Sequence, residues 1–219
     1  MELWEGFVKT RFLNVDKLKV EGFHRAVGGN LGGDWCSCVW TSDEVYFVIG
    51  DAPGHGSEAA TSVPALREML LSALSRSTGS PADALRAANA LACLTCCESF
   101  SALIATYHPS TATLTVATAG HPPPIVARRD FAVTLPVEGV LLGADSGSQY
   151  HEVELPLCEG DRVLLYTDGL IEAKKAPIEC EKILMNQLSR NVSMRGIIDS
   201  VVPRQPCDDV GVLLLQYNG

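Results

Sequence analysis

The sequence predicts an α+β fold in which antiparallel β-sheets are covered by helices. Strand-like segments occur in groups, and helical segments lie between these groups, instead of the strict strand–helix alternation of a parallel sheet. Of the 219 residues, 47% are hydrophobic and 20% are charged, which is the composition of a folded protein. A chain of this length buries roughly 70% of its unfolded surface, which is enough for the core of one domain.

The first half of the chain predicts two strands followed by two helices. Residues 16–28 have extended character, and the apolar run 45–49 predicts a buried strand. In residues 58–77 apolar side chains recur at three- and four-residue steps, which predicts an amphipathic helix. A second helix is predicted over 80–97, because it opens with a serine at the N-cap and a proline at the first helical position.

The second half is dominated by strands. Two strand-like runs, 100–107 and 111–119, are joined by a short turn and predict a hairpin. The turn-rich stretch 136–148 predicts a surface loop. The remaining predicted elements are strands at 125–128, 150–155, 162–166 and 210–217, and helices at 177–190 and 194–202.

The charge balance limits the classes of partner. Lysine and arginine number 17 and aspartate and glutamate 26, which gives a formal net charge of −9. Such a surface repels nucleic-acid phosphates and anionic membranes, so we expect neither as a partner. The acidic excess has two readings, a solvated surface that favours solubility or a cluster of carboxylates that holds cations.

The cysteines and the N-terminus indicate a cytoplasmic protein. The sequence begins without the apolar segment of a signal peptide, and no stretch approaches the ~18 apolar residues of a membrane span. We therefore expect the eight cysteines to be reduced and mostly buried. The one Cys-x-x-Cys pair, Cys93 and Cys96, has no second pair at the spacing of a zinc site.

Four aspartates share one sequence context, because each lies in a tight turn or beside a predicted strand. Asp34 follows two glycines, and Asp51 follows the apolar run 45–49. Asp168 comes directly after one strand, and Asp208, with a second aspartate behind it, comes before the last strand. Strand ends meet at the edge of a sheet, so these carboxylates can converge although they are far apart in the sequence.

Converging carboxylates would raise one another's pKa unless cations lie between them. Mg²⁺ and Mn²⁺ prefer oxygen ligands, and two such ions about 4 Å apart can activate a water and hold a phosphoryl group. A single aspartate in such a position is more often a turn or capping residue. The prediction of a metal site therefore depends on the whole set.

Five short motifs follow one another along the chain. They are Gly32-Gly33-Asp34-Trp35, Ile49-Gly50-Asp51-Ala52-Pro53-Gly54-His55-Gly56, Ala119-Gly120-His121-Pro122-Pro123-Pro124, Gly160–Leu170 and Asp208-Asp209-Val210. In order and spacing they resemble the SpoIIE-type serine/threonine phosphatases, of the metal-dependent PPM phosphatase superfamily. The resemblance extends from about residue 18 to residue 217.

The resemblance implies a four-layer αββα sandwich, in which two antiparallel sheets lie between helical layers. It places a single phosphatase domain over residues 18–219, after a short N-terminal extension of residues 1–17. It also implies two bound divalent cations, Mn²⁺ or Mg²⁺. The residues implied to hold them are Asp51 as the bridge, the backbone carbonyl of Ala52, Asp168, Asp208 and, mainly through water, Asp34.

The implied reaction is hydrolysis of phosphoserine or phosphothreonine by direct attack of a metal-bridging hydroxide. Asp51 and Asp168 are the central catalytic residues of this prediction. His55, between two glycines, has two candidate roles, since it either protonates the leaving alkoxide or shapes the turn through hydrogen bonds. Arg25 is the candidate for binding the phosphate. His121 is interpreted as structural.

The implied substrate is a phosphorylated STAS-domain protein of a bacterial partner-switching or stressosome pathway that controls stress signalling. Because the matching region leaves no room for a sensory domain, we expect a free-standing phosphatase or one controlled by a separate regulatory partner. The alternative is a catalytically silent module on the same fold that binds a phosphoprotein. An α/β-hydrolase is disfavoured, because the sequence lacks a Gly-x-Ser-x-Gly nucleophile motif.

Overall fold

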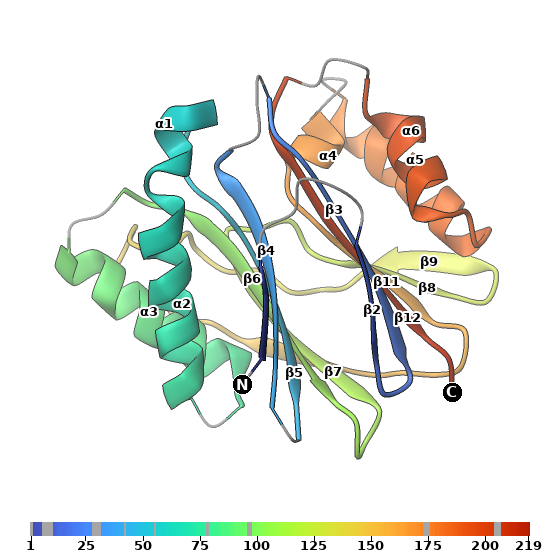
Figure 1. Cartoon of the computed structure of the whole chain (residues 1–219), viewed down its shortest axis with the longest axis horizontal. Coiled ribbons are helices and arrows are strands. Elements are labelled where there is room, and N and C mark those ends of the chain that lie inside the picture. Colours follow the sequence, from blue (N-terminus) through green and yellow to red (C-terminus); the bar gives the residue numbers. More distant parts are fainter. Residues whose placement is uncertain are drawn as a thin grey trace.

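Two six-stranded antiparallel β-sheets pack face to face between two layers of helices (Figure 1). This αββα arrangement, seen in a computed structural model, confirms the predicted fold. The structure describes residues 2–5, 11–27, 32–41, 43–54, 56–77, 79–95, 98–172, 176–203 and 207–219.

Each sheet combines strands from distant parts of the chain. In spatial order the first sheet contains β1 (Glu2–Glu5), β4 (Asp34–Trp40), β5 (Val45–Asp51), β6 (Ser101–His108), β7 (Thr113–Ala119) and β10 (Glu152–Pro156). The second contains β2 (Arg11–Val15), β3 (Leu18–Arg25), β12 (Val210–Tyr217), β11 (Arg162–Tyr166), β8 (Ile125–Arg128) and β9 (Phe131–Thr134). The segment before residue 18 thus supplies one strand to each sheet.

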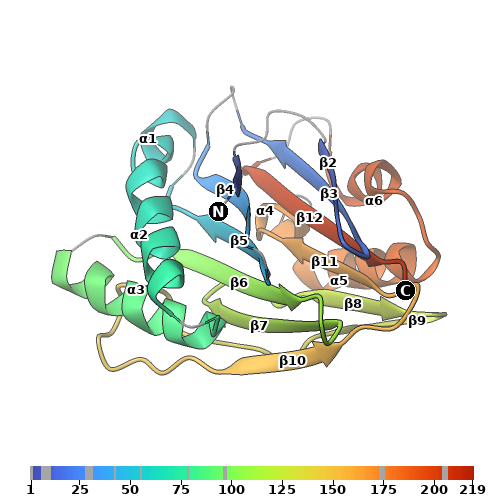
Figure 2. The same ribbon diagram turned by 60° about the horizontal axis from the view of Figure 1, so that its bottom comes forward.

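The helices form one layer on the outside of each sheet (Figures 1 and 2). The first sheet is covered by α1 (Gly56–Ala60), α2 (Val63–Arg76) and α3 (Pro81–Thr95). The second is covered by α4 (Gly169–Glu172), α5 (Pro177–Ser189) and α6 (Met194–Val201). Buried side chains consequently form three apolar layers, one between the sheets and one beneath each group of helices.

Strand β5 shows why the central strands are apolar throughout. Phe47 and Ile49 belong to the core between the sheets, whereas Val48 and Tyr46 pack beneath the helices. Because both faces are buried, the strand has an unbroken apolar run in place of the alternation of a half-exposed strand. The strand predicted over 45–49 is confirmed and extends to Asp51.

The helices begin largely where the sequence predicts. At the start of α3, the Ser80 hydroxyl accepts a hydrogen bond from the backbone N–H of Asp83 at 3.2 Å, which confirms the predicted N-cap. The single helix predicted over 58–77 is instead two helices, α1 and α2. Ser62 lies at the break, and its hydroxyl donates to the carbonyl of Ala59 at 2.8 Å, competing with the helical backbone pattern.

None of the described cysteines forms a disulfide bond. Cys36, Cys38 and Cys180 are buried, as predicted, whereas Cys158 and Cys207 are exposed. Within the described parts of the chain, no helix has both the length and the apolar character needed to cross a membrane.

Candidate metal centre

Two aspartates meet at one edge of the first sheet. Asp34 is the first residue of β4 and Asp51 is the last residue of β5. The antiparallel register makes these two residues direct cross-strand partners, so their side chains start from neighbouring points of the sheet. The backbone N–H of Ala52 then donates to the carbonyl of Gly33 at 3.1 Å, which extends this pairing by one more contact.

The second sheet brings two further aspartates to the same region. Asp168 follows β11 and Asp208 precedes β12, and these strands pair antiparallel. The backbone at Gly169 lies very close to the backbone at Asp209, and a Cβ added to Gly169 would lie 1.8 Å from the carbonyl oxygen of Asp209. Only glycine allows this approach, which holds the segments carrying Asp168 and Asp208 against each other.

Thr167 links the two sheets at this edge. Its hydroxyl donates to a carboxylate oxygen of Asp34 at 2.7 Å and accepts from the backbone N–H of Gly211 at 2.8 Å. A Cβ at Gly211 would lie 3.2 Å from the methyl carbon of Thr167 and 3.4 Å from the sulfur of Cys36. A larger side chain at position 211 would therefore be crowded against Thr167 and Cys36.

The pKa values show that the four carboxylates act on one another. Burial raises the pKa of Asp51 to about 7, and the charges of Asp168 and Asp208 add to the increase. Burial also raises the pKa of Asp34 well above its usual value, with Asp51 as the largest charge contribution. The pKa of Asp168 is raised by burial and then by Asp208. The residues predicted to share a site therefore do lie within electrostatic reach of each other.

Asp209 has a separate, structural role. Its carboxylate accepts backbone hydrogen bonds from Val27 and Gly33, both at 2.7 Å, and its side chain is buried. It thereby ties Val27 to Gly33 of the first motif. Sequence reasoning placed Asp209 only as a neighbour of Asp208, and it missed Thr167. The adjacent pair Asp208-Asp209 could have indicated this role. Neighbouring side chains in an extended segment point in opposite directions, so only one of the two can face the cluster.

The donor set fits hard divalent cations. The residues near the cluster supply carboxylate oxygens, and the raised pKa values of Asp34, Asp51 and Asp168 show that burial and mutual repulsion oppose their ionisation. Among the described residues, no three histidine, cysteine or acidic side chains are arranged tightly enough to enclose one ion. Mg²⁺ usually binds through one or two carboxylates and keeps several waters, so it does not require such an enclosure.

The remaining predicted residues are differently placed. Ala52 is buried beside the cluster, and its carbonyl oxygen would lie 2.8 Å from a Cβ added at Gly33. Its role as a ligand stays a prediction. His55 lies outside the described residues, so both of its candidate roles stay open.

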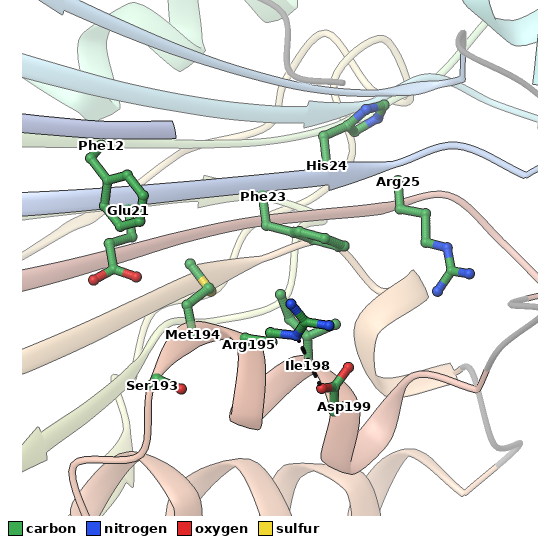
Figure 3. Close-up of a pocket in the computed structure, with 10 residues that line it drawn as sticks. All are labelled: Phe12, Glu21, Phe23, His24, Arg25, Ser193, Met194, Arg195, Ile198 and Asp199. Atoms are coloured by element: carbon green, nitrogen blue, oxygen red, sulfur yellow. Dashed lines mark ion pairs between the residues drawn. The ribbon is translucent and has the colours of Figure 1, made fainter. Parts of the chain in front are cut away.

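Arg25 ends β3, where it is the cross-strand partner of Val210, two residues after Asp208. The Arg25 guanidinium donates to the carbonyl of Pro203 at 3.5 Å. It lines a cavity of about 740 Å³ between β3 and α6, whose apolar residues include Phe23, Met194 and Ile198 (Figure 3). None of the four clustered aspartates lines this cavity, and the contact of Arg25 with phosphate stays a prediction.

Comparison with known proteins gives the family directly. Residues 41–218 match the family model described as stage II sporulation protein E (SpoIIE). This match covers more than half of the chain and includes the segments of Asp51, Asp168 and Asp208.

Solved structures show the same fold. The RsbU and RsbW domains of a Mycobacterium tuberculosis protein share 25% identity and a TM-score of 0.80, with 92% of this chain and 62% of that chain covered. RsbX in complex with magnesium shares 17% identity and a TM-score of 0.73, and the match covers 95% of this chain and 100% of that chain. The PP2C phosphatase domain of SpoIIE from Bacillus subtilis, with a fragment of its regulatory domain, shares 18% identity and a TM-score of 0.79. That match covers 96% of this chain and 63% of that chain.

The chain thus spans less than two thirds of the length of the first and third of these structures. The sequence motifs, the two antiparallel sheets and the family match all agree. The chain belongs to the SpoIIE family, and it has the fold of the PPM-type protein phosphatases.

Proposed function

We propose that this protein is a metal-dependent protein phosphatase that removes phosphate from serine or threonine of a partner protein. The observation that carries the proposal is the electrostatic coupling of Asp51, Asp168 and Asp208, which come from both sheets. A cluster of buried carboxylates with raised pKa values is unfavourable by itself and becomes favourable when divalent cations bind. The family and the fold support the same class of activity.

In this proposal each carboxylate has a stated task. Asp51 is the cross-strand partner of Asp34, and the charge of Asp168 on the other sheet raises its pKa. In this proposal Asp51 contacts both ions, as the family resemblance implies. Asp168 and Asp208 hold ions from the second sheet, with the Ala52 carbonyl as a further oxygen. Asp34, already engaged with Thr167, contributes mainly through water.

When bound, two divalent cations would supply positive charge for the phosphoryl group and lower the pKa of a water. In the overall reaction a bond forms between the water oxygen and phosphorus, and the bond from phosphorus to the serine or threonine oxygen breaks. The serine or threonine oxygen then receives a proton. His55 is a candidate for the proton donor, and its alternative role is to shape the turn through hydrogen bonds. The carboxylates stay unchanged through the reaction, and no covalent bond to the protein is needed.

We further propose a phosphorylated STAS-domain or stressosome protein as the substrate, with control by a separate partner. Among the similar structures, one contains RsbU and RsbW domains, and another is described in connection with the bacterial stressosome. The structure described in connection with the stressosome shares 22% identity and a TM-score of 0.67 with this chain. These likenesses support the choice of substrate class, and a pull-down with phosphorylated STAS proteins tests it.

The activity is tested with p-nitrophenyl phosphate and a phosphoserine peptide, each with Mn²⁺, with Mg²⁺ and with EDTA. We expect release of phosphate that depends on the cation and stops in EDTA. Freshly purified, metal-loaded protein that binds a phosphoprotein but releases no phosphate would instead support the silent binding module.

A further inference from the structure

His121 is a buried histidine whose backbone is fixed on both sides. The residue follows β7 and has only 4% of its surface exposed. The hydroxyl of Thr118 donates to the carbonyl of His121 at 2.9 Å and accepts from its N–H at 3.2 Å. The ring therefore extends from a rigid turn, and its position is set by the fold rather than by solvent.

The ring contacts the end of β6, beside the proposed bridging carboxylate. Nδ1 lies 2.8 Å from the hydroxyl of Ser101, the first residue of β6. Ser101 is the cross-strand partner of Asp51, so this contact lies next to the proposed bridging carboxylate. The other ring nitrogen, Nε2, is buried and has no hydrogen-bond partner of good geometry among the described residues. The contact with Ser101 is therefore the hydrogen bond that orients the ring.

The protonation state of the ring follows from its surroundings. Burial lowers the pKa of His121 to about 3, so the ring is neutral at physiological pH. A neutral imidazole has one donor and one acceptor nitrogen. The partner of Nδ1 is the hydroxyl of Ser101, which can donate or accept according to the tautomer of the ring.

We infer that His121 is a positioning residue that fixes the end of β5 carrying Asp51, through its hydrogen bond to Ser101, the cross-strand partner of Asp51. The inference rests on the proposed function, because it concerns the affinity of that carboxylate and its neighbours for divalent cations. Side chains that orient metal ligands at one remove typically change metal affinity by about 10- to 100-fold when they are replaced. A histidine that only filled space in the core would not have this effect.

Substitutions can separate positioning from general stability. Ser101→Ala removes only the hydroxyl, Ser101→Thr retains it, and His121→Gln removes the ring while keeping a polar side chain. Thr106→Val is the matched control, because Thr106 is a buried residue of the same strand whose hydroxyl donates to the Gly79 carbonyl at 3.3 Å. It is paired with Tyr46, five positions along the ladder from the Asp51 pair.

The measurement is the Mn²⁺ dissociation constant of the purified full chain, followed by the electron paramagnetic resonance signal of free Mn²⁺ without substrate. The melting temperature in EDTA is recorded for each variant. We expect Ser101→Ala and His121→Gln to weaken Mn²⁺ binding by about 10- to 100-fold. Ser101→Thr and Thr106→Val should bind Mn²⁺ as the wild type does, even if Thr106→Val melts at a lower temperature.

Wild-type Mn²⁺ affinity in both Ser101→Ala and His121→Gln would overturn the inference, whatever their melting temperatures. Equal weakening in Thr106→Val would also overturn it, because the effect would then be general loosening. A wild-type protein that binds Mn²⁺ but hydrolyses no phosphate ester would instead overturn the proposed function alone. The comparison of dissociation constants would still decide the role of His121.

Discussion

Thr167 donates a hydrogen bond of 2.7 Å to Asp34 across the space between the two sheets, and both residues are buried. The same hydroxyl accepts a hydrogen bond from the backbone N–H of Gly211 at 2.8 Å, so it acts both as a donor and as an acceptor. This contact lowers the pKa of Asp34, against the larger upward effect of burial. Thr167 is therefore a neutral residue that keeps one carboxylate of the cluster in place.

We predict that Thr167→Val lowers the free energy of unfolding of the metal-free protein. The substitution keeps the shape of the side chain but leaves a buried carboxylate oxygen and a buried N–H without their partner, which costs about 1–3 kcal/mol. Urea denaturation in EDTA measures the change. Thr167→Ser is the control, since it retains the hydroxyl, and equal stability of the valine and wild-type proteins would contradict the prediction.

We predict that Asp51→Asn and Asp168→Asn each reduce Mn²⁺-dependent hydrolysis of p-nitrophenyl phosphate by about a thousandfold or more. Each substitution removes a charged metal ligand, and a bound metal contributes several kcal/mol of transition-state stabilisation, with about tenfold in rate for each 1.4 kcal/mol. Asp130→Asn, at an exposed position outside the cluster, should retain full activity. Near-wild-type turnover in either cluster variant would show that the ligand assignment is wrong.

The metal-free protein should lose stability as the pH rises from about 4 to about 7. The pKa of Asp51 is about 7 in the folded protein against an ordinary value of 3.8, and the values of Asp34 and Asp168 are also raised. A carboxyl whose folded-state pKa is raised contributes stability below its unfolded pKa and loses it as the pH passes its folded pKa.

The test is the melting temperature in EDTA, compared between wild type and Asp51→Asn. Because asparagine resembles the protonated carboxyl, the variant should match the wild type near pH 4 and exceed it near pH 8. Parallel curves over this range would mean that Asp51 titrates normally.

Divalent cations should stabilise the folded protein. Ions that bind only the native carboxylate cluster shift unfolding by mass action, by about 2.7 kcal/mol when free Mn²⁺ is a hundred times its dissociation constant. Differential scanning fluorimetry with Mn²⁺, against an EDTA baseline, measures the increase in melting temperature. The increase should be much smaller in Asp51→Asn, and an increase of the same size there would point to binding elsewhere on the acidic surface.

The sequence predicts the fold class and most regular elements, because apolar periodicity is strong in them. It does not predict β4, although all but one of its residues are buried, because Asp34, Ser37 and two cysteines interrupt the apolar pattern. Ser37 has only 1% of its surface exposed. The sequence also does not predict the short strand β9. Its apolar residues Phe131 and Val133 are exposed at the edge of the second sheet.

The motifs select Asp34, Asp51, Asp168 and Asp208, and the raised pKa values indicate that these carboxylates lie within electrostatic reach of each other. Their role as metal ligands stays a prediction, and their geometry could not be predicted from the sequence. The strand register that pairs Asp34 with Asp51 depends on long-range hydrogen bonding, which one sequence does not reveal. The stretch 136–148, predicted as a surface loop, likewise contains the buried residues Val137 and Leu142, because tertiary contacts decide burial there.

Strand β12 lies near the middle of the second sheet, between β3 and β11, although the ribosome makes it after every other described strand. Until it is made, β3 and β11 have no common neighbour, and Asp34, Asp51 and Asp168 lack Asp208. Closing loops of this length is entropically costly, and sheets built from such distant pairs fold slowly. A nascent chain therefore lacks the full set of four clustered aspartates until β12 has joined the second sheet.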